Sequence, residues 1–209
     1  MDQQAYWDGV SGTKQFTTPF QAELFARFVG REQNILDVGC GYGRTLGELH
    51  RRGYRSLTGV DFSRGMILRG RRENPTLDLR VMEGKTLDFP DETFDAAILF
   101  AVLTCILRDA DQAFLIREIR RVLRPGGVLY VNDFLLNTDE RNLARYAAGE
   151  AQLGVYGAFT LPEGAVLRHQ EEGQVKRLLS DFETLHFERL TFPTMNGHTS
   201  NGFCYFGRK

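Results

Sequence analysis

Residues 35–43 read Ile-Leu-Asp-Val-Gly-Cys-Gly-Tyr-Gly, a short apolar strand that leads directly into three spaced glycines. Residues 45–52 have a helical pattern, and Gly53 suits the position at which such a helix ends. Glycines between a strand and a helix allow a tight turn and let the backbone approach a ligand that a Cβ atom would block. The stretch therefore predicts an α/β unit with a ligand at the carboxyl end of its first strand.

The spacing of these glycines distinguishes the loop from two common phosphate-binding motifs. The dinucleotide motif requires Gly-x-Gly-x-x-Gly, and when it is started at Gly39 its third glycine position holds Arg44. The P-loop motif requires Gly-Lys followed by Ser or Thr, and no such triplet follows the glycines. The loop is therefore suited to a ligand that need not present a pyrophosphate.

Helix-like and strand-like segments alternate from residue 19 to residue 133, which is typical of a parallel α/β sheet. Helices are expected at 19–29, 45–52, 63–73 and 111–123, and strands at 34–38, 56–60, 77–82, 95–100 and 128–132. Towards the end of the chain we expect a helix at 173–182, strands at 184–192 and 202–207, and a turn at Asn196-Gly197. Because right-handed crossovers place the carboxyl ends of parallel strands at one sheet edge, the ligand site is expected there.

A second acidic residue, Asp61, is expected at the end of the second strand, on the same sheet edge as the glycine loop. A carboxylate in this position can accept two hydrogen bonds from the vicinal hydroxyl groups of a ribose. Nicotinamide cofactors use the same contact, so the residue indicates a nucleoside without identifying it.

Four segments in register are similar to the motifs of one enzyme family. Residues 35–43 resemble motif I of class I S-adenosylmethionine-dependent methyltransferases, and residues 59–63 (Gly-Val-Asp-Phe-Ser) resemble that family's acidic motif at the second strand. Residues 83–95 resemble the loop that holds the adenine, and residues 120–127 resemble the entry to the fifth strand. The four segments occur in the family's order, so the chain is expected to be a member of this family.

The resemblance implies an α/β fold of the Rossmann-like, doubly wound type: a mostly parallel seven-stranded sheet with an antiparallel last strand and helices on both faces. It also implies an enzyme that moves the methyl group of S-adenosylmethionine to a nucleophile and releases S-adenosylhomocysteine. The compact chain and its formal charge of −1 favour a small-molecule acceptor. Amino-methylating enzymes of nucleic acids have Asn/Asp-Pro-Pro-aromatic where residues 100–103 read Phe-Ala-Val-Leu. An RNA or protein methyltransferase, or a non-catalytic S-adenosylmethionine-binding regulatory domain, is the alternative.

The resemblance assigns the methionine part of the cofactor to the glycine loop and to the end of the fourth strand. Gly39 and Gly41 would admit this part, and Asp37 would order the loop and nearby water molecules. The backbone carbonyl group of Phe100 would accept a hydrogen bond from the methionine ammonium group.

The resemblance assigns the adenosine part of the cofactor to residues that follow the second and third strands. Asp61 would bind the ribose hydroxyl groups, and Phe62 and Met66 would pack on the adenine face. Glu83 stands where family members usually have an aspartate that accepts a hydrogen bond from the adenine amino group, so its longer side chain departs from the pattern. The backbone N–H of Gly84 would remain available to the ring.

Two residues near the same sheet edge are candidates for the acceptor side of the reaction. Asp133, at the end of the fifth strand, is a candidate base or substrate ligand, and a turn-capping carboxylate is the alternative. His169 is a candidate base or anion contact, and a helix-capping or water-facing histidine is the alternative.

Two segments outside the alternation are expected to flank the ligands within a single domain, 1–209. Residues 137–169 mix glycine and proline with aromatic and charged residues, and we expect an inserted helix and loop over the sheet edge. Residues 1–18 carry Trp7 and Phe16, and the resemblance implies a lid over the cofactor.

The composition argues against several other classes of protein. Hydrophobic residues make up 42% and charged residues 25% of the 209 residues, which is ordinary for a globular domain. The near-neutral charge disfavours a nucleic-acid partner, and no run approaches the roughly 18 apolar residues of a membrane span. The three cysteines and four histidines show no ligand spacing, so we expect no metal site and a cytoplasmic protein with reduced thiols.

Overall fold

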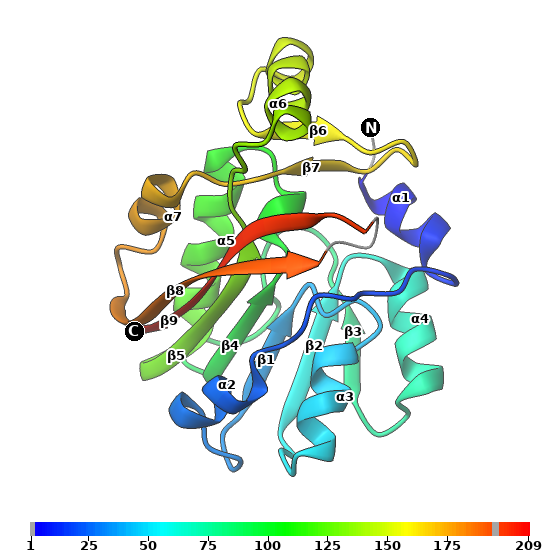
Figure 1. Cartoon of the computed structure of the whole chain (residues 1–209). Helices are drawn as coiled ribbons and strands as arrows, with labels where there is room; N and C mark the ends of the chain where they lie inside the picture. The colour runs from blue at the N-terminus through cyan, green and yellow to red at the C-terminus, as the bar shows by residue number, and fades with distance from the viewer. Residues whose placement is uncertain (1–2, 194–196) are drawn as a thin grey trace.

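The computed structural model describes residues 3–193 and 197–209, and a seven-stranded sheet crosses its centre (Figure 1). The strands lie in the order β3-β2-β1-β4-β5-β9-β8. Their bounds are β1 Ile35–Val38, β2 Leu57–Asp61, β3 Asp78–Val81, β4 Phe94–Phe100, β5 Leu123–Phe134, β8 Glu183–Pro193 and β9 Thr199–Arg208. Strands β1 to β5 pair in parallel, whereas β9 runs antiparallel to both of its neighbours, β5 and β8. The predicted mostly parallel seven-stranded sheet with an antiparallel last strand is confirmed.

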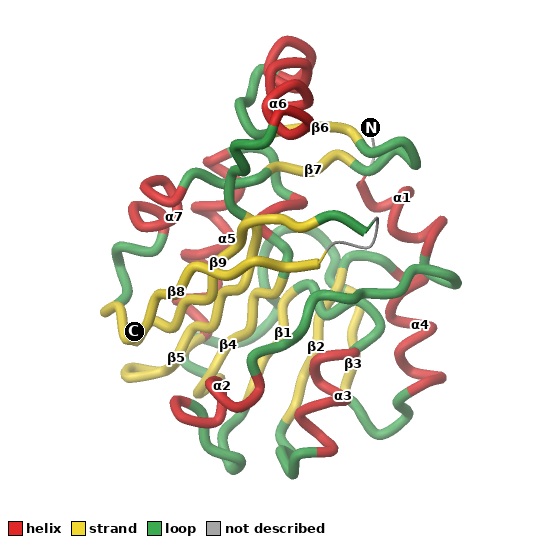
Figure 2. Tube along the Cα trace, viewed as in Figure 1, coloured by secondary structure: helices red, strands yellow, loops and turns green. Residues whose placement is uncertain are grey.

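Helices cover both faces of this sheet, as Figure 2 shows. Their bounds are α2 Ala22–Phe28, α3 Arg44–Arg51, α4 Arg64–Glu73, α5 Asp109–Val122 and α7 Glu172–Leu178. On one face Phe25 of α2 and Leu46 of α3 are fully buried in a single apolar layer. On the opposite face Ile119 of α5 and Val175 of α7 belong to a second apolar layer. The doubly wound arrangement is therefore confirmed as well.

Strand β4 is apolar along most of its length because both of its faces are covered. Its residues Ala96, Ala97, Ile98 and Leu99 are each 0% exposed, and they belong alternately to the two apolar layers. A continuous apolar run of this kind is typical of a central parallel strand. The carboxyl end of the strand lies between those of β1 and β5, and β2 follows next to β1, so one sheet edge gathers the residues on which the site depends.

The observed bounds of several elements differ from the expected ones. The helix expected from residue 19 begins at Ala22, so that Pro19 stays outside it. The strand expected at 128–132 extends over 123–134, because its residues also pair with β9 and with the start of β4. In the expected Asn196-Gly197 turn, Asn196 lies outside the described residues, and Gly197 has the positive φ of 75° that such a turn requires.

Residues 137–169 form an insertion that contains a hairpin as well as the expected helix. Helix α6 (Glu140–Leu153) is followed by β6 (Ala158–Thr160) and β7 (Val166–Arg168), which pair with each other in antiparallel. In Figure 1 these three elements stand above the carboxyl ends of the parallel strands. A hairpin thus stands where a loop was expected. The sequence does not indicate it, because each of its strands has only three residues, too few to produce a recognisable alternation. We call α6, β6 and β7 the cover.

The first helix, α1 (Gln3–Val10), is joined to the start of α4 through a side-chain cap. The hydroxyl group of Ser63 accepts a hydrogen bond from the backbone N–H of Met66 at 3.2 Å and donates to the carboxylate of Asp8 at 2.6 Å. The same carboxylate accepts from the backbone N–H of Gly65 at 2.9 Å. Ser63 thus caps α4, and the cap also fastens the N-terminal segment beside β2.

Replacing Ser63 with alanine should lower the free energy of unfolding by about 0.5–2 kcal/mol, because the loss of an N-cap has this range. Urea unfolding followed by circular dichroism measures the change. Ser56→Ala, at an exposed position before β2, is the control and should change stability by less than about 0.5 kcal/mol. If the two variants were equally stable, the cap would contribute nothing.

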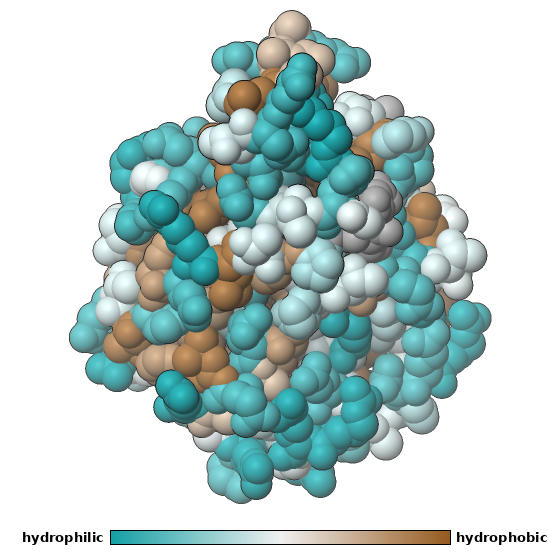
Figure 3. All heavy atoms as spheres, viewed as in Figure 1, coloured by the Kyte–Doolittle hydropathy of each residue, from teal (hydrophilic) through white to brown (hydrophobic). Residues whose placement is uncertain are grey.

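The surface is mixed in polarity on the face shown in Figure 3, where hydrophobic residues gather near α6 and over the outer strands. Leu143 of α6 and Tyr156 are two of the large apolar side chains with 45% or more of their area exposed. Within the described residues no helix is long and apolar enough to cross a membrane.

Candidate functional site

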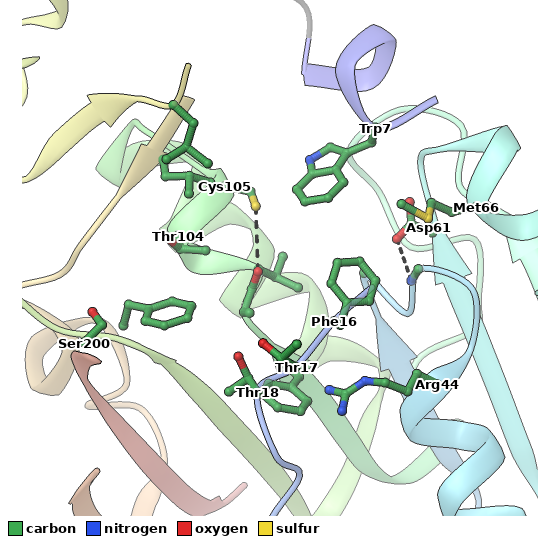
Figure 4. A pocket seen from close by; sticks show the side chains of 18 of the residues that line it. Trp7, Phe16, Thr17, Thr18, Arg44, Asp61, Met66, Thr104, Cys105 and Ser200 are labelled. Carbon is green, nitrogen blue, oxygen red and sulfur yellow. Dashed lines mark hydrogen bonds between the residues drawn. The ribbon is translucent and has the colours of Figure 1, made fainter. Parts of the chain in front are cut away.

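A cavity lies at the carboxyl ends of the parallel strands, between the glycine loop, the N-terminal segment and the cover (Figure 4). The volume of the cavity is about 220 Å³. One part, which we call the loop half, is lined by the glycine loop and by residues after β2. The other part, which we call the cover half, is lined by the cover and by the ends of β4 and β5.

The glycine loop faces the cavity with backbone that other residues would block. Gly39 and Gly41 have positive φ values of 75° and 56°, a conformation that strains residues with a Cβ atom. A Cβ atom on Gly39 would lie 2.4 Å from Cγ2 of Val102, and one on Gly41 would lie 3.0 Å from Cε2 of Phe16. Both the backbone conformation and the adjoining space therefore require glycine at these positions.

Asp61 connects the end of β2 to the glycine loop and lines the cavity. Its Oδ2 atom accepts a hydrogen bond from the backbone N–H of Gly41 at 2.8 Å, which Figure 4 marks. Its Oδ1 atom accepts one from the backbone N–H of Ser63 at 2.8 Å. Burial raises the pKa of this carboxyl group, and the two N–H bonds oppose the shift. Each carboxylate oxygen can accept a further hydrogen bond, so the side chain can also bind ligand hydroxyl groups.

Asp37 and Arg44 give the loop half both signs of charge. The Oδ1 atom of Asp37 is buried and has no hydrogen-bond partner among the described residues. Burial and the nearby charge of Asp61 raise the pKa of Asp37 to about 7, and the positive charge of Arg44 opposes the shift. The guanidinium group of Arg44 lies 5.3 Å from the centre of the Phe100 ring, and no carboxylate in the described chain forms an ion pair with it. This combination suits a ligand that carries a cationic and an anionic group.

The four residues assigned to the adenine ring separate into two pairs. Phe62 and Met66 line the cavity, and Met66 is almost fully buried. Glu83 and Gly84 are exposed and stand outside the cavity lining, so the structure does not bring them together with the first pair. The segment that carries them is held towards α5, where Arg121 donates to two of its carbonyl groups at 2.7 and 2.8 Å. Their contact with adenine stays a prediction.

Aromatic residues of the N-terminal segment cover the loop half. Trp7 and Phe16 both point into the cavity in Figure 4. The Phe16 ring stacks on the ring of Tyr42, with centres 5.3 Å apart and planes only 5° apart. This packing places apolar surface next to the glycine loop, and the role of the segment as a lid stays a prediction.

The N-terminal segment also contacts the cover across the cavity. The ammonium group of Lys14 lies 3.3 Å from a carboxylate oxygen of Glu163, in the turn between β6 and β7. The side-chain amide of Gln3 donates a hydrogen bond to the carbonyl group of Val166 in β7. Two elements that are far apart in the sequence thus meet above the site.

The cover half is walled mainly by apolar side chains. Phe134 lies at the end of β5, Phe159 in β6, and Leu161 and Leu167 lie in the hairpin. His169 completes this wall, and its ring stacks on Phe134 with centres 5.5 Å apart. The wall can hold the apolar body of a small molecule.

Asp133 lies behind this wall and is not part of the cavity lining. It is 0% exposed, and its carboxylate accepts hydrogen bonds from the backbone N–H groups of Phe134 at 2.8 Å and Thr104 at 3.3 Å. Thr104 and Cys105, in the short 3-10 helix η1 (Leu103–Cys105), do line the cavity. These contacts support the capping alternative, and a role of Asp133 as a base stays a prediction.

The stability of the protein should show the titration of Asp133. Burial raises its pKa to about 7, against about 3.9 in an unfolded chain. Between these pH values the folded protein binds a proton that the unfolded chain does not, and the stability that this proton gives is lost as the pH rises towards 7. Asp133→Asn abolishes this titration. The difference in unfolding free energy, variant minus wild type, should therefore increase between pH 5 and pH 8. We expect an increase of at least about 1.4 kcal/mol, the free energy that corresponds to a shift of one pKa unit. Urea unfolding at several pH values measures it, and a constant difference would contradict the expectation.

His169 lines the cover half and is held by two partners at its Nδ1 atom. The hydroxyl group of Tyr146 lies 2.6 Å from Nδ1, and the side-chain amide nitrogen of Asn137 lies 3.2 Å from it. Burial, together with the positive charges of Arg145 and Arg141, lowers the pKa of His169 to about 3. A histidine with this pKa is neutral and weakly basic at neutral pH, which favours the anion contact over the base among its predicted roles.

Three cationic residues of the cavity, Arg44, Arg141 and Arg145, were not singled out by the sequence patterns. Arg44 directly follows the glycine loop, and this position is the signal that would have identified it. Arg141 and Arg145 lie in α6 among other charged residues, and the sequence contains no feature that separates them from solvent-facing arginines.

Comparison with known proteins places the central part of the chain in a described family. Residues 36–131 match a family model described as a methyltransferase domain. The matched segment includes the glycine loop, Asp61 and the whole of β4.

Two curated relatives show similarity beyond this segment. The phosphatidylethanolamine N-methyltransferase of Cereibacter sphaeroides is 34% identical over 143 residues, which cover 63% of this chain and 66% of that protein. The 27-O-demethylrifamycin SV methyltransferase of Amycolatopsis mediterranei is 31% identical over 168 residues, which cover 76% of this chain and 61% of that protein. The chain thus spans just under two thirds of the length of these relatives.

A solved structure matches the fold over nearly its entire length. The crystal structure of a methyltransferase dependent on S-adenosylmethionine, from Methanosarcina mazei, has a TM-score of 0.85 and 26% identity, covering 92% of this chain and 99% of that one. The strand order, the glycine loop with Asp61 and these similarities agree with one another. Residues 36–131 thus match a methyltransferase domain, and the chain resembles the class I S-adenosylmethionine-dependent methyltransferases in its fold and in its glycine loop with Asp61.

Proposed function

We propose that this protein is an enzyme that moves the methyl group of S-adenosylmethionine to a nucleophilic atom of a small molecule. The cavity carries this proposal, because its loop half has the polar groups for the cofactor and its cover half has adjoining apolar space. S-adenosylhomocysteine is then the second product.

The residues of the loop half fit this cofactor. Gly39 and Gly41 leave the backbone open where a Cβ atom would collide with its neighbours, and the buried Oδ1 atom of Asp37 is without a protein partner. We assign the ribose hydroxyl groups to Asp61, the cationic groups to the side of Asp37, and the methionine carboxylate to Arg44. This assignment uses the two signs of charge that the loop half provides.

Methyl transfer forms a bond from the acceptor atom to the methyl carbon while the sulfur–carbon bond breaks and its electron pair returns to sulfur. The protein contributes mainly by holding the acceptor in line, and good alignment can supply roughly 7–11 kcal/mol of the barrier. Trp7 and Phe16 shield the reacting groups from water. Because His169 has a pKa of about 3 and Asp133 lies behind the wall, neither is placed as an ordinary general base in this structure.

The covering of the cavity supports a small acceptor. The contacts of Lys14 with Glu163 and of Gln3 with Val166 join the N-terminal segment to the cover above the site. An acceptor must therefore fit beneath these contacts, which disfavours a folded RNA or a protein surface. The near-neutral net charge of −1 points the same way.

A labelled-methyl transfer screen tests the proposed activity. The protein is incubated with S-adenosylmethionine that carries a radioactive methyl group and with separate small-molecule, RNA and protein fractions. We expect label in the small-molecule fraction only. Label in the RNA or protein fraction would overturn the acceptor class, and binding of the cofactor without any transfer would favour a regulatory domain.

We also propose that the protein acts in the cytoplasm. Its cysteines, Cys40, Cys105 and Cys204, all carry free thiols, which is the usual state in a reducing compartment. Cell fractionation with an antibody tests this location, and recovery in an extracellular fraction would contradict it.

A further inference from the structure

The cover half contains a positive charge that the protein itself does not neutralise. Arg145 of α6 is half-buried and lines the cavity, with its guanidinium carbon 3.6 Å from the centre of the Phe159 ring. Its Nε atom is buried without a hydrogen-bond partner, and within residues 3–193 and 197–209 no carboxylate forms an ion pair with it. A buried guanidinium nitrogen without an acceptor is costly unless a ligand supplies one.

The carboxylates around the cavity are directed to other partners. Glu163 is paired with Lys14 at 3.3 Å, and Asp37 and Asp61 belong to the loop half. Arg141, one helical turn before Arg145, also lines the cavity. The cover half therefore has a net positive character over an apolar wall.

His169 adds a neutral hydrogen-bond donor to this positive group. The hydroxyl oxygen of Tyr146 accepts from the backbone N–H of Asn137 at 3.2 Å, so its own hydrogen is available for the Nδ1 atom of His169 at 2.6 Å. The side-chain amide nitrogen of Asn137 lies 3.2 Å from the same Nδ1 atom and is also a donor. Its orientation is fixed, because its oxygen accepts from the backbone N–H of Asn201 at 2.8 Å. From these two neighbouring donor groups we assign Nδ1 as the acceptor and the ring hydrogen to Nε2.

Arg145 and His169 both contact the ring of Phe159. The ring centres of Phe159 and His169 are 4.9 Å apart in an edge-on arrangement, and the Arg145 guanidinium group covers Phe159. The Nε2 atom makes no hydrogen bond to another described residue, although its ring lines the cavity. A fixed cation and a fixed neutral donor thus border the same apolar wall.

We propose that the methyl acceptor is an apolar, ring-containing carboxylic acid whose carboxylate is bound by Arg145 and by the Nε2–H group of His169. This inference rests on the proposed function and names the chemical class of its acceptor. A guanidinium group binds a carboxylate through paired N–H donors, and the wall of Phe134, Phe159 and the two leucines receives the ring. Arg141 is already paired with Asp139 at 4.0 Å, so the single charge of a carboxylate matches the one unpaired guanidinium group of Arg145, and a phosphate dianion would leave a charge uncompensated.

The test compares acids with their uncharged amides. The full-length protein, saturated with S-adenosylhomocysteine, is titrated with benzoate, cinnamate, 2-naphthoate and indole-3-acetate, with the matching amides, and with naphthyl phosphate. We expect at least one acid to bind and every binding acid to bind at least tenfold more tightly than its amide and than the phosphate. Arg145→Met should reduce the preference for the acid to less than threefold, and Arg145→Lys should restore part of it.

The controls separate this proposal from the proposed function. S-adenosylhomocysteine should bind wild type and Arg145→Met with affinities within threefold, and Arg177→Met, at an exposed position on α7, should keep the full preference for acids. Failure of S-adenosylhomocysteine to bind wild type would contradict the proposed function itself. If S-adenosylhomocysteine binds but no acid does, if acids and amides bind alike, or if the preference persists in Arg145→Met, the acceptor class is wrong.

Nitrogen NMR of the histidine rings gives a second, independent readout. In the free protein His169 should be neutral with its hydrogen on Nε2, and the bound acid should shift the Nε2 signal more than the Nδ1 signal. Tyr146→Phe should change the Nδ1 signal because it removes the hydroxyl donor at 2.6 Å. A hydrogen found on Nδ1 would contradict the proposed donor.

Discussion

Replacing Asp61 with alanine should weaken the binding of both S-adenosylmethionine and S-adenosylhomocysteine by ten- to about a hundredfold. The substitution removes the acceptor for ligand hydroxyl groups, and each hydrogen bond to a charged group contributes about 1.5–3 kcal/mol. It also removes the partner of the backbone N–H groups of Gly41 and Ser63, which hold the glycine loop beside β2. Isothermal titration calorimetry measures the two affinities directly.

Two further variants make this result specific. Asp61→Asn keeps the shape and one oxygen acceptor, so its loss of affinity should be smaller than that of Asp61→Ala. Asp181→Ala, at an exposed position before β8, should bind both compounds as wild type does. Circular dichroism of each variant shows whether the fold is retained, and unchanged affinity in folded Asp61→Ala would refute the assigned nucleoside site.

Replacing Gly149 with alanine should detach the cover from its own hairpin. A Cβ atom at this position in α6 would lie 1.8 Å from the carbonyl oxygen of Ala158 in β6, far inside van der Waals contact. Both sides of the contact are backbone, so a rotamer change cannot relieve it, and we expect a cost of at least about 3 kcal/mol, the upper end of overpacking. Hydrogen exchange should become much faster in α6, β6 and β7.

The loop half should be affected far less by this change, because Gly39, Gly41 and Asp61 lie outside the cover. S-adenosylhomocysteine should therefore bind Gly149→Ala within about fivefold of wild type. Gly9→Ala is the matched control, since it is also a helical glycine and nothing lies within 4 Å of the added Cβ atom. Unchanged exchange in the cover of Gly149→Ala would contradict the close packing of α6 on β6.

The sequence predicts the sheet well because its signals are local. The apolar run of β4 and the glycines after β1 each carry their own physical reason, and the strand order follows the family pattern. The hairpin of the cover is different, since its three-residue strands are formed through pairing and through the contact at Gly149, which depends on two segments meeting in space.

The candidate site divides in the same way. The glycine loop and Asp61 are adjacent at strand ends, so topology alone predicts their meeting. The character of His169 depends on Tyr146, Asn137 and Arg145, which reach it only after the insertion has folded. No spacing in the sequence indicates such a set of contacts, and the same holds for the position of Asp133 behind the wall.

The central claim is that the loop half binds S-adenosylmethionine. Calorimetric titration of the wild-type protein with S-adenosylhomocysteine tests it most directly, with S-adenosylmethionine as the competitor. We predict one binding site per chain, saturable and displaced by S-adenosylmethionine. Absence of binding by both compounds to a protein that circular dichroism shows to be folded would contradict the account.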